Sequence, residues 1–504
     1  MHGKVKIAQK ALHGGFGMYR KESDQISIAE FYSPFGKLDP KNRWAKIADM
    51  IPWERYETKY AERFCEDNGA PAIRFRTAMG TLIIKQRTGH SDDEVLQDIM
   101  ENPYMQYLIG LHEFTTEAPF AQSSITNFRK YITQEMINEI NDDLFRKGRK
   151  GGSDNGNGNP GGSAGREESD ETEAANRGTL MLDSTCAPAY ITYPTDVSLL
   201  NEAREKLEGI IDRLHIHAPG TLKPRTYRQT ARGRYLRFIR NRKPQIRMIR
   251  KAVGQQLRYV GRDLRHIDTQ LQTISDEALT VYQRRWLPAI RKLYQQQKHM
   301  YESRTHSVES RIVSIGQPHV RPIVRGKANA AVEFGAKVSV SLTGGYAFVE
   351  KLSWEAFNEE ATLIPAIETC RGRYGCYPEA VLADKVHRNR TNLSYCKRHG
   401  IRITGPRLGR PPKETDPSAI RQERYDAAQR NAIEGKFGEG KTKYGLDRIM
   451  ARLMDSSETV IAMAFLCMNI NRRLKVILCR FLHVFVRSFL WVRVKNLFAF
   501  GVIE

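Results

Sequence analysis

Three acidic side chains have the type and setting expected of a divalent-cation site. Asp183 ends the apolar run Thr-Leu-Met-Leu, and Asp384 ends the similar run Ala-Val-Leu-Ala. Each run resembles a short buried strand, and strand ends are where ligands collect in mixed sheets. A third acid, Glu434, lies farther along the chain in a stretch of helical character. Because hard cations prefer carboxylate oxygens, these three residues together could hold Mg²⁺.

Two cations accompany the third acid. Arg430, Glu434 and Lys441 are four and then seven residues apart, which corresponds to rotations of about 400° and 700° along a helix. Their side chains share one face if the helix continues through Gly435 and Gly438. An ordinary ion pair between Arg430 and Glu434 would explain their spacing equally well.

Other polar residues near these segments have simpler explanations. Asp196 follows Tyr-Pro-Thr and is expected to cap the helix that begins after it. Glu333 and Glu439 are competing candidates for the third acid. His387 and His399 flank the second aspartate region and could contact phosphate, although solvent-facing histidines fit the pattern as well.

The charge balance points to a polyanionic partner. The 504 residues include 80 Lys and Arg against 57 Asp and Glu, a net charge of +23. Such an excess attracts nucleic acid first and an anionic membrane surface second. Apolar residues make up 40% and charged residues 27%, which is ordinary for a globular protein with room for two to four domains.

Residues 223–265 hold fifteen of these cations, and Asp263 is their only acid. Tyrosines and a phenylalanine are interleaved with them. A solvated helix normally mixes its charges, so this segment favours binding to a phosphate backbone, with an acidic protein partner as the alternative. The cations expected to contact DNA here are Arg225, Arg228, Arg232, Arg234, Arg237, Arg240 and Lys243.

Cysteine content and the chain ends suggest a reducing compartment. The seven cysteines form no CxxC pair, so neither a disulfide framework nor a zinc ribbon is indicated, and a cytoplasmic location is expected. No signal-peptide pattern is seen at the beginning. Residues 476–503 are apolar but contain four cations, so a buried helix is expected there, with a membrane-surface helix as the alternative.

A Gly/Asn/Ser-rich and then acidic stretch divides the chain. Residues 147–178 lack apolar periodicity and are predicted to form a flexible linker. Residues 1–146 are predicted to be helical, with a capping box at Ser91–Glu94 and a helix that begins at Pro103. Short helices are compatible with DNA-end binding through a helix-turn-helix, and equally with a plain bundle.

The remainder is predicted to be an α/β catalytic domain over 179–470, with a basic helical insertion at about 201–310 and a helical tail over 471–504. Alternation predicts a strand over 336–342 and a hairpin partner over 346–350. The predicted strands and helices after this hairpin cover residues 363–369, 380–384, 392–398, 401–403 and 418–435, with a basic loop at 407–413.

Several long stretches resemble one protein family. HSDDEVLQDIMENPYMQYLIGL, LMLDSTCAPAYITYPTDVSLLNEARE, VRGKANAAVEFGAKVSVS, AVLADKVHRNRTNLSYCKRHGIRITGPRLGRP and RNAIEGKFGEGKTKYGLDRIMAR follow each other in this order. They are similar to insertion-sequence transposases with an RNase H-like catalytic core, a DDE triad and a helical N-terminal domain. The resemblance covers nearly the whole chain and implies a mixed-sheet core.

The resemblance assigns roles to the residues already singled out. It implies Asp183 as the first catalytic acid, Asp384 as the second and Glu434 as the third, with Arg430 and Lys441 as basic companions of the glutamate. The three acids would hold two Mg²⁺ ions, with Mn²⁺ as a substitute.

One position departs from the family pattern. A Tyr stands three residues before the Arg in related sequences, whereas this chain has Ala427 there and Tyr425 two positions earlier. The expectation of a Tyr contact with a DNA end is therefore weaker.

The implied activity is hydrolysis of a phosphodiester at each terminal inverted repeat, followed by joining of the 3′-OH ends to target DNA. Double-stranded DNA would be the partner, in a homo-oligomer associated with the nucleoid. Two alternatives stay open at this point. They are another RNase H-like nuclease, such as a resolvase, and a catalytically silent DNA-binding protein of transposase descent.

Overall fold

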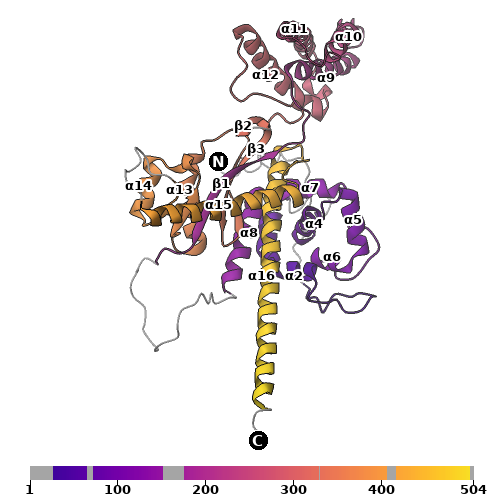
Figure 1. The fold of residues 1–504 in the computed structure, drawn as a ribbon. Coiled ribbons are helices and arrows are strands. Elements are labelled where there is room, and N and C mark those ends of the chain that lie inside the picture. Colours follow the sequence, from indigo (N-terminus) through magenta and orange to yellow (C-terminus); the bar gives the residue numbers. More distant parts are fainter. Residues whose placement is uncertain (1–25, 65–71, 151–174, 328–329, 406–415, 500–504) are drawn as a thin grey trace, which may run out of the picture.

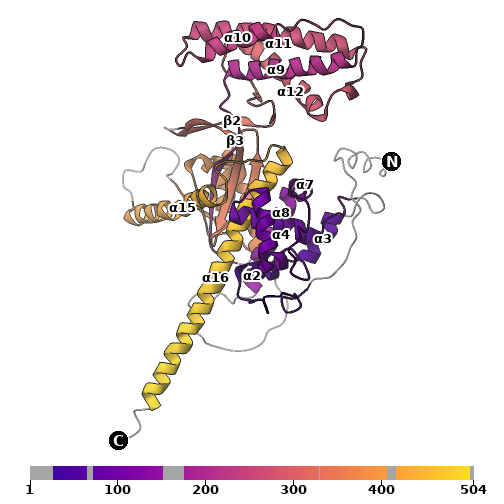
Figure 2. The same cartoon turned by 90° about the vertical axis from the view of Figure 1, so that its right-hand side faces the viewer.

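The computed structural model describes residues 26–64, 72–150, 175–327, 330–405 and 416–499. A mixed sheet lies at the centre, with the N-terminal helices packed beside it (Figure 1). A helical insertion stands beyond one end of the sheet, and a long C-terminal helix extends past the other end (Figure 2). The chain therefore has the α/β organisation expected, with helices preceding a mixed sheet.

The central sheet combines antiparallel and parallel pairing. Strand β1 pairs antiparallel with β3 and parallel with β5, and β5 pairs parallel with β6. Strands β2 and β4 both pair antiparallel with β3, on the edge away from β1. Central β1 thus joins the two halves of the sheet. The strands are β1 (Thr179–Pro188), β2 (Arg321–Lys327), β3 (Ala330–Thr343), β4 (Tyr346–Ser353), β5 (Ala380–Ala383) and β6 (Arg402–Ile403).

The predicted hairpin is confirmed. Thr343 pairs with Tyr346 across a two-residue loop, and Gly344 and Gly345 both have positive φ angles, of 59° and 82°. A two-residue loop of this kind needs a left-handed backbone at both positions, which glycine adopts without strain.

Strand β1 is longer than predicted. The sequence suggested that it ends at Asp183, but β3 pairs with it from Met181 to Pro188. Asp183 therefore lies inside the strand. At Gly335, an added Cβ would lie 2.1 Å from the carbonyl oxygen of Ala187, so glycine permits the two strands to approach at this end.

The N-terminal part is helical, as the sequence indicates. The capping box is present, with the Ser91 hydroxyl accepting from the Glu94 N–H at 3.2 Å. Pro103 occupies the first turn of its helix and Gly110 follows that helix with a φ of 84°. The helices are α2 (Arg43–Met50), α3 (Trp53–Ala61), α4 (Phe75–Thr88), α5 (Asp92–Glu101), α6 (Pro103–Leu108), α7 (Ser124–Tyr131) and α8 (Gln134–Lys150).

Helix α16 (Met454–Ala499) joins the N-terminal helices to the sheet. Residues of α4, α8, β3 and α16 belong to one continuous apolar core. Inside it, the buried Asn469 amide donates to Asn141 Oδ1 at 2.8 Å and to the Ala347 carbonyl at 2.7 Å. The N-terminal helices are therefore packed into the core and are not held by a linker alone.

Two of the predicted domain boundaries fall inside helices. Helix α8 continues to Lys150, so the predicted linker overlaps its last turn, and residues 151–174 lie outside the described residues. The predicted tail at 471 begins in the middle of α16. Most side chains of the apolar segment 476–503 also lie outside the description. None of the described helices has an apolar stretch long enough to span a membrane.

The insertion forms a separate layer with a core of its own. Its apolar core consists mainly of α9, α11 and α12 residues and does not merge with that of the sheet. Thr195, and not Asp196, caps the first helix, because its hydroxyl accepts from the Ser198 N–H at 3.2 Å. The helices are α9 (Asp196–Ile216), α10 (Arg228–Ile239), α11 (Ile246–Leu271), η1 (Asp276–Ala278) and α12 (Val281–Ser303).

Three further helices lie beside the parallel half of the sheet. The predicted helices at 363–369, 392–398 and 418–435 are all present with longer bounds, whereas the predicted basic loop at 407–413 lies outside the described residues. Helix α13 packs on β1 and β5 in a third apolar cluster. The elements are η2 (Glu359–Thr362), α13 (Leu363–Tyr374), η3 (Lys385–His387), α14 (Arg390–Arg398) and α15 (Pro417–Lys443).

Candidate active site

The register of the parallel strands brings the two aspartates together. Leu182 of β1 pairs with Ala383 of β5, so Asp183 and Asp384 follow at the next position on adjacent strands. Strands of one sheet are about 4.8 Å apart. Two residues 201 positions apart in the sequence therefore become neighbours because the two strands run in the same direction.

Burial distinguishes the first aspartate from the second. The Asp183 carboxylate accepts the Ser184 N–H at 2.7 Å. Burial raises the pKa of Asp183 despite this hydrogen bond and the nearby Arg430 guanidinium, and the carboxylates of Glu359 and Asp384 add to the rise. Four charged groups therefore act on one another around the middle of β1.

The second aspartate lies at the surface. Asp384 follows β5 and caps η3, where its carboxylate accepts the Lys385 N–H at 2.7 Å. Its side chain is 51% exposed and lies 3.5 Å from the Arg430 guanidinium. One carboxylate is therefore partly enclosed by the sheet, while the other is open to a ligand from solvent.

Helix α15 carries the third acid past this pair. The helix continues through Gly435 and Gly438, so Arg430, Glu434 and Lys441 do share one side of it, as the spacing predicts. Ile433 is fully buried, which anchors the helix to the protein beside Glu434.

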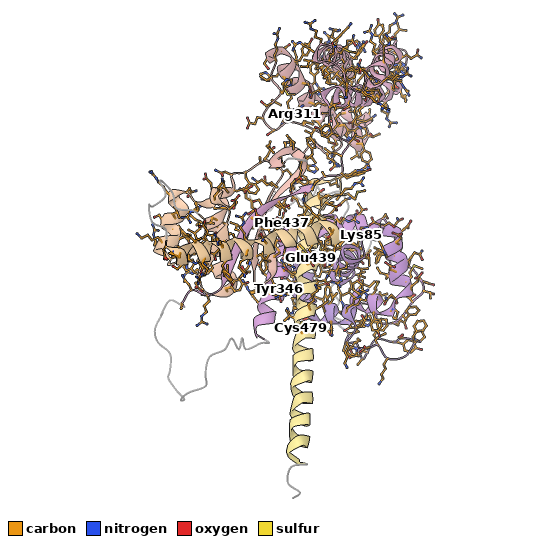
Figure 3. All side chains as sticks on the ribbon, viewed as in Figure 1. Lys85, Arg311, Tyr346, Phe437, Glu439 and Cys479 are labelled. Atoms are coloured by element: carbon orange, nitrogen blue, oxygen red, sulfur yellow. The ribbon has the colours of Figure 1, made fainter. Side chains whose placement is uncertain are left out.

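Close packing at Gly440 fixes the C-terminal part of α15. An added Cβ at Gly440 would lie 2.6 Å from Leu446 Cδ1, so the helix lies closely against the segment that follows it. Figure 3 shows Phe437 and Glu439 where α15 passes α16. The rotation of α15 about its own axis is therefore fixed relative to the sheet.

The structure brings Arg430 closer to the aspartates than it brings Glu434. The alternative explanation of the spacing, an i,i+4 ion pair with Glu434, is not formed among the described residues, because Arg430 pairs with Asp384 instead. The Glu434 side chain is exposed one helical turn farther on. Within the described residues, no three His, Cys, Asp or Glu side chains are grouped closely enough to hold a metal ion.

The competing third acids lie elsewhere. Glu439 is about 180° around α15 from Arg430 and pairs with Lys436 at 2.7 Å. Glu333 is opposite Ile323 of β2, beyond the stretch of β3 that pairs with β1. Neither is positioned beside Asp183.

Two residues near the aspartates were not identified, or were misjudged, from the sequence. Glu359 of η2 pairs with Lys337 at 2.8 Å, and its carboxylate acts on Asp183. His387 was expected in solvent or on phosphate, but it is only 1% exposed, and its ring nitrogens have no hydrogen-bond partner among the described residues. Burial lowers the pKa of His387, although the carboxylates of Glu359 and Asp384 oppose this.

The sequence offered only a weak signal for Glu359. Glu359 lies in an acidic run without apolar periodicity, and its position follows from the way η2 packs beside η3. His399 also differs from expectation, since its ring contacts Tyr377 and Tyr395 at centroid distances of 4.5 and 4.6 Å.

The predicted DNA-binding cations of the insertion are not part of this site. They lie on or just before α10 and α11, in the layer that stands beyond the sheet (Figure 2). Arg228 pairs with Asp212 at 2.7 Å, and Arg234 donates to the Tyr259 hydroxyl at 2.7 Å. The other predicted cations have exposed side chains, namely Arg225, Arg232, Arg237, Arg240 and Lys243.

Comparison with known proteins identifies two segments. Residues 381–471 match a family described as Transposase DDE domain, and residues 33–131 match one described as Transposase domain (DUF772). These two segments of the chain are similar to transposase domains. The first match contains Asp384, Arg430 and Glu434, whereas Asp183 and the insertion lie outside both matches.

One curated relative agrees in part of the chain. It is "Uncharacterized protein ORF8 in nfe locus" of Rhizobium meliloti, 28% identical over 170 residues, which are 34% of this chain and 73% of that protein. No solved structure matches the chain. The family resemblance therefore rests on sequence, and the site geometry is described from this chain alone.

Proposed function

We propose that this chain is a transposase that binds the terminal inverted repeats of an insertion element, cuts the DNA there and joins the 3′-OH ends to target DNA. The parallel register that places Asp183 beside Asp384 is the observation that carries this proposal. Arg430, on the helix that also bears Glu434, lies 3.5 Å from the Asp384 carboxylate. The second and third acids belong to the segment that matches the transposase DDE family.

The proposed core is RNase H-like. Two features support this assignment, namely the strand order β4-β3-β1-β5-β6 and the change from antiparallel to parallel pairing at β1. The insertion leaves the core after β1 and returns before β2. It can therefore vary without disturbing the register that aligns the aspartates.

The carboxylates suit a hard divalent cation in their chemistry. We propose that Asp183, Asp384 and Glu434 hold two Mg²⁺ ions, or Mn²⁺ as a substitute. Bound ions of this kind activate an attacking oxygen and stabilise a leaving oxygen in phosphodiester cleavage. Because Asp384 is half exposed and Glu434 is exposed, both can reorient toward a cation without breaking buried contacts.

Arg430 has two proposed roles. Its guanidinium neutralises Asp384. If Asp384 held a cation, Arg430 would be available to bind a DNA phosphate, as would Lys441 on the same side of α15.

Exposed cations of the insertion are proposed to bind the DNA backbone. Arg232, Arg237 and Arg240 project from α10 without a nearby acid in the sequence. Each cation placed on a phosphate releases counterions, so these contacts supply affinity more than sequence specificity. We further propose a homo-oligomer that holds two DNA ends, associated with the nucleoid in the cytoplasm.

Cleavage of the element's own ends tests the proposal. Purified full-length protein is incubated with Mg²⁺ and duplexes that carry the inverted repeats flanking its gene, beside Asp183→Asn, Asp384→Asn and Glu434→Gln. Glu439→Gln is the matched control, because it removes an acid on the opposite side of α15. Nicking at the repeat ends is expected from wild type and control only.

Three results would contradict the proposal. Cleavage by Asp183→Asn at the wild-type rate would remove the proposed site. Binding of the repeats without cleavage by the wild-type protein, in either Mg²⁺ or Mn²⁺, would favour a silent DNA-binding protein. Preference for branched DNA over the repeats would instead indicate a resolvase.

A further inference from the structure

A cavity of about 870 Å³ lies where three parts of the molecule meet. Its walls come from α7 of the N-terminal helices, from α9 and α12 of the insertion, and from the segments that follow β1 and α15. We call it the junction cleft. It is separate from the carboxylate site, since none of the three acids lines it.

The charges of the junction cleft are mostly positive. Its lining holds five cations and a single acid, Glu202. Lys206 lies 3.4 Å from this acid, and Arg129 is engaged by Asp92 at 2.6 Å. The excess charge suits an anionic ligand that extends along the cleft. The five cations are Arg129, Lys130, Lys206, Arg285 and Arg452.

Aromatic rings are unusually exposed in the same cleft. Tyr193 is 73% exposed, Tyr282 is 67% exposed and Tyr190 is 42% exposed. Large aromatic side chains normally cover apolar surface, so three of them in one cationic cavity point to a ligand with flat faces.

These rings are held in place rather than free to collapse. Tyr193 packs edge-on against Phe334 with centroids 5.6 Å apart, and Tyr282 lies 6.0 Å from the Trp286 ring. The Tyr190 N–H donates to the Ile449 carbonyl at 2.9 Å, while the Arg448 guanidinium lies 3.8 Å from its ring centroid. The preformed rings would therefore lose little conformational entropy on binding.

Strand β1 and its continuation connect the carboxylate site to the cleft. Tyr190 follows Asp183 by seven residues along β1 and its continuation, a path of about 23 Å in an extended strand. Successive nucleotides of one strand rise about 3.4 Å in a duplex. DNA that leaves the aspartates along β1 would therefore reach the cleft after about seven nucleotides.

We propose that the junction cleft binds unpaired nucleotides of a DNA end, with bases stacked on Tyr193 and Tyr282 and phosphates held by the surrounding cations. Bases in an intact duplex hide their faces, so stacking on these rings requires a melted or single-stranded segment. This inference rests on the proposed function, because it assumes that DNA approaches Asp183. It adds a binding site for a distorted strand end, separate from the site of cleavage.

Binding of oligonucleotides without metal tests the cleft. Fluorescence anisotropy is measured with labelled single-stranded dT12 and with a blunt duplex of equal length, in EDTA. The double variant Tyr193→Ala, Tyr282→Ala is expected to bind dT12 at least tenfold more weakly, with a smaller change for the duplex. The double variant to Phe keeps both rings and is expected to bind like wild type.

A matched control removes an exposed tyrosine elsewhere. Tyr32 is 68% exposed and does not line the cleft, so Tyr32→Ala should leave dT12 binding unchanged. Wild-type binding of dT12 by the double alanine variant, with an unchanged melting temperature, would overturn the proposal. Equal loss for dT12 and duplex would also overturn it, because a phosphate surface alone would explain that result.

A different measurement tests the proposed function. Asp183→Asn should bind dT12 as wild type does, because the cleft is formed by other residues. Normal DNA cleavage by that variant would overturn the catalytic assignment and would leave the anisotropy result unaffected.

Discussion

The carboxylate site and the basic insertion depend on sequence in opposite ways. Asp183, Asp384 and Arg430 are far apart in the chain and meet through strand register and helix docking. The cations of residues 223–265 are contiguous in sequence, and the helices α10 and α11 simply display them. The first region is a product of tertiary structure, whereas the second is largely a product of composition.

This difference affects how far each region could be predicted. Counting charged residues in the sequence overestimates the number of cations in the insertion that can bind DNA. Arg228 pairs with Asp212, and Arg262 pairs with the fully buried Asp263. The spacing at α15 correctly predicted that Arg430, Glu434 and Lys441 share one side of the helix. It left an Arg430–Glu434 ion pair open as an alternative, whereas Arg430 pairs with Asp384 in the structure.

The largest expected effect is a loss of DNA cleavage with little loss of DNA binding. Asp384→Asn should reduce DNA cleavage by about 10³-fold, because one lost carboxylate removes several kcal/mol of metal-assisted stabilisation. Binding of the repeat duplex should change little, since most of the proposed DNA-binding cations lie in the insertion, away from Asp384. Cleavage is followed on denaturing gels and the Kd by anisotropy. If the variant still cleaved DNA, the strand register that brings Asp183 and Asp384 together would have no role in catalysis.

A pair of glycines in α15 tests whether helix docking fixes the site. Gly440→Ala places a Cβ 2.6 Å from Leu446 and should cost about 1–3 kcal/mol of unfolding free energy through overpacking. Gly435→Ala meets no atom within 4 Å and should stabilise the helix by about 0.5–1 kcal/mol. Urea unfolding measures both. Equal effects of the two changes would mean that α15 is not packed as described.

The segment between the insertion and β2 should make stability depend on pH. His319 packs edge-on against Trp354, and burial together with Arg285 and Arg321 lowers its pKa to about 4. The unfolded chain binds this proton more readily, so stability is lost as pH falls from about 6.5 toward 4, by about 2 kcal/mol at pH 5. Urea unfolding at pH 7 and pH 5 checks the slope.

The control for this slope is His319→Phe, which keeps a ring against Trp354 but has no titrating group. It should show a weaker loss of stability over the same pH range. An identical slope in wild type and variant would assign the acid sensitivity to other groups.

Single arginines of the insertion give the smallest expected effect. Arg237→Ala should lower the slope of log K against log salt by about one and weaken repeat and non-repeat DNA alike. Arg228→Ala removes a residue held by Asp212, so it should change the slope less. A salt series of anisotropy titrations compares them. A larger slope change for Arg228 would mean that this ion pair opens on DNA.

Sequence patterns determined much of the secondary structure. Period-two alternation and the Gly344–Gly345 pair predicted the hairpin, and the Ser91 capping box predicted the start of α5. These features are local, because a turn or a cap depends on residues only a few positions apart. The two aspartates were also singled out by the apolar runs that precede them.

Tertiary structure alone decided what surrounds those aspartates. Pairing with β3 carried β1 past Asp183, and packing of η2 and η3 brought Glu359 near and buried His387. The junction cleft likewise needs α7, α9 and α12 to meet. Strand register and interhelical packing depend on contacts between residues hundreds of positions apart, and a spacing rule for neighbouring residues carries no information about them.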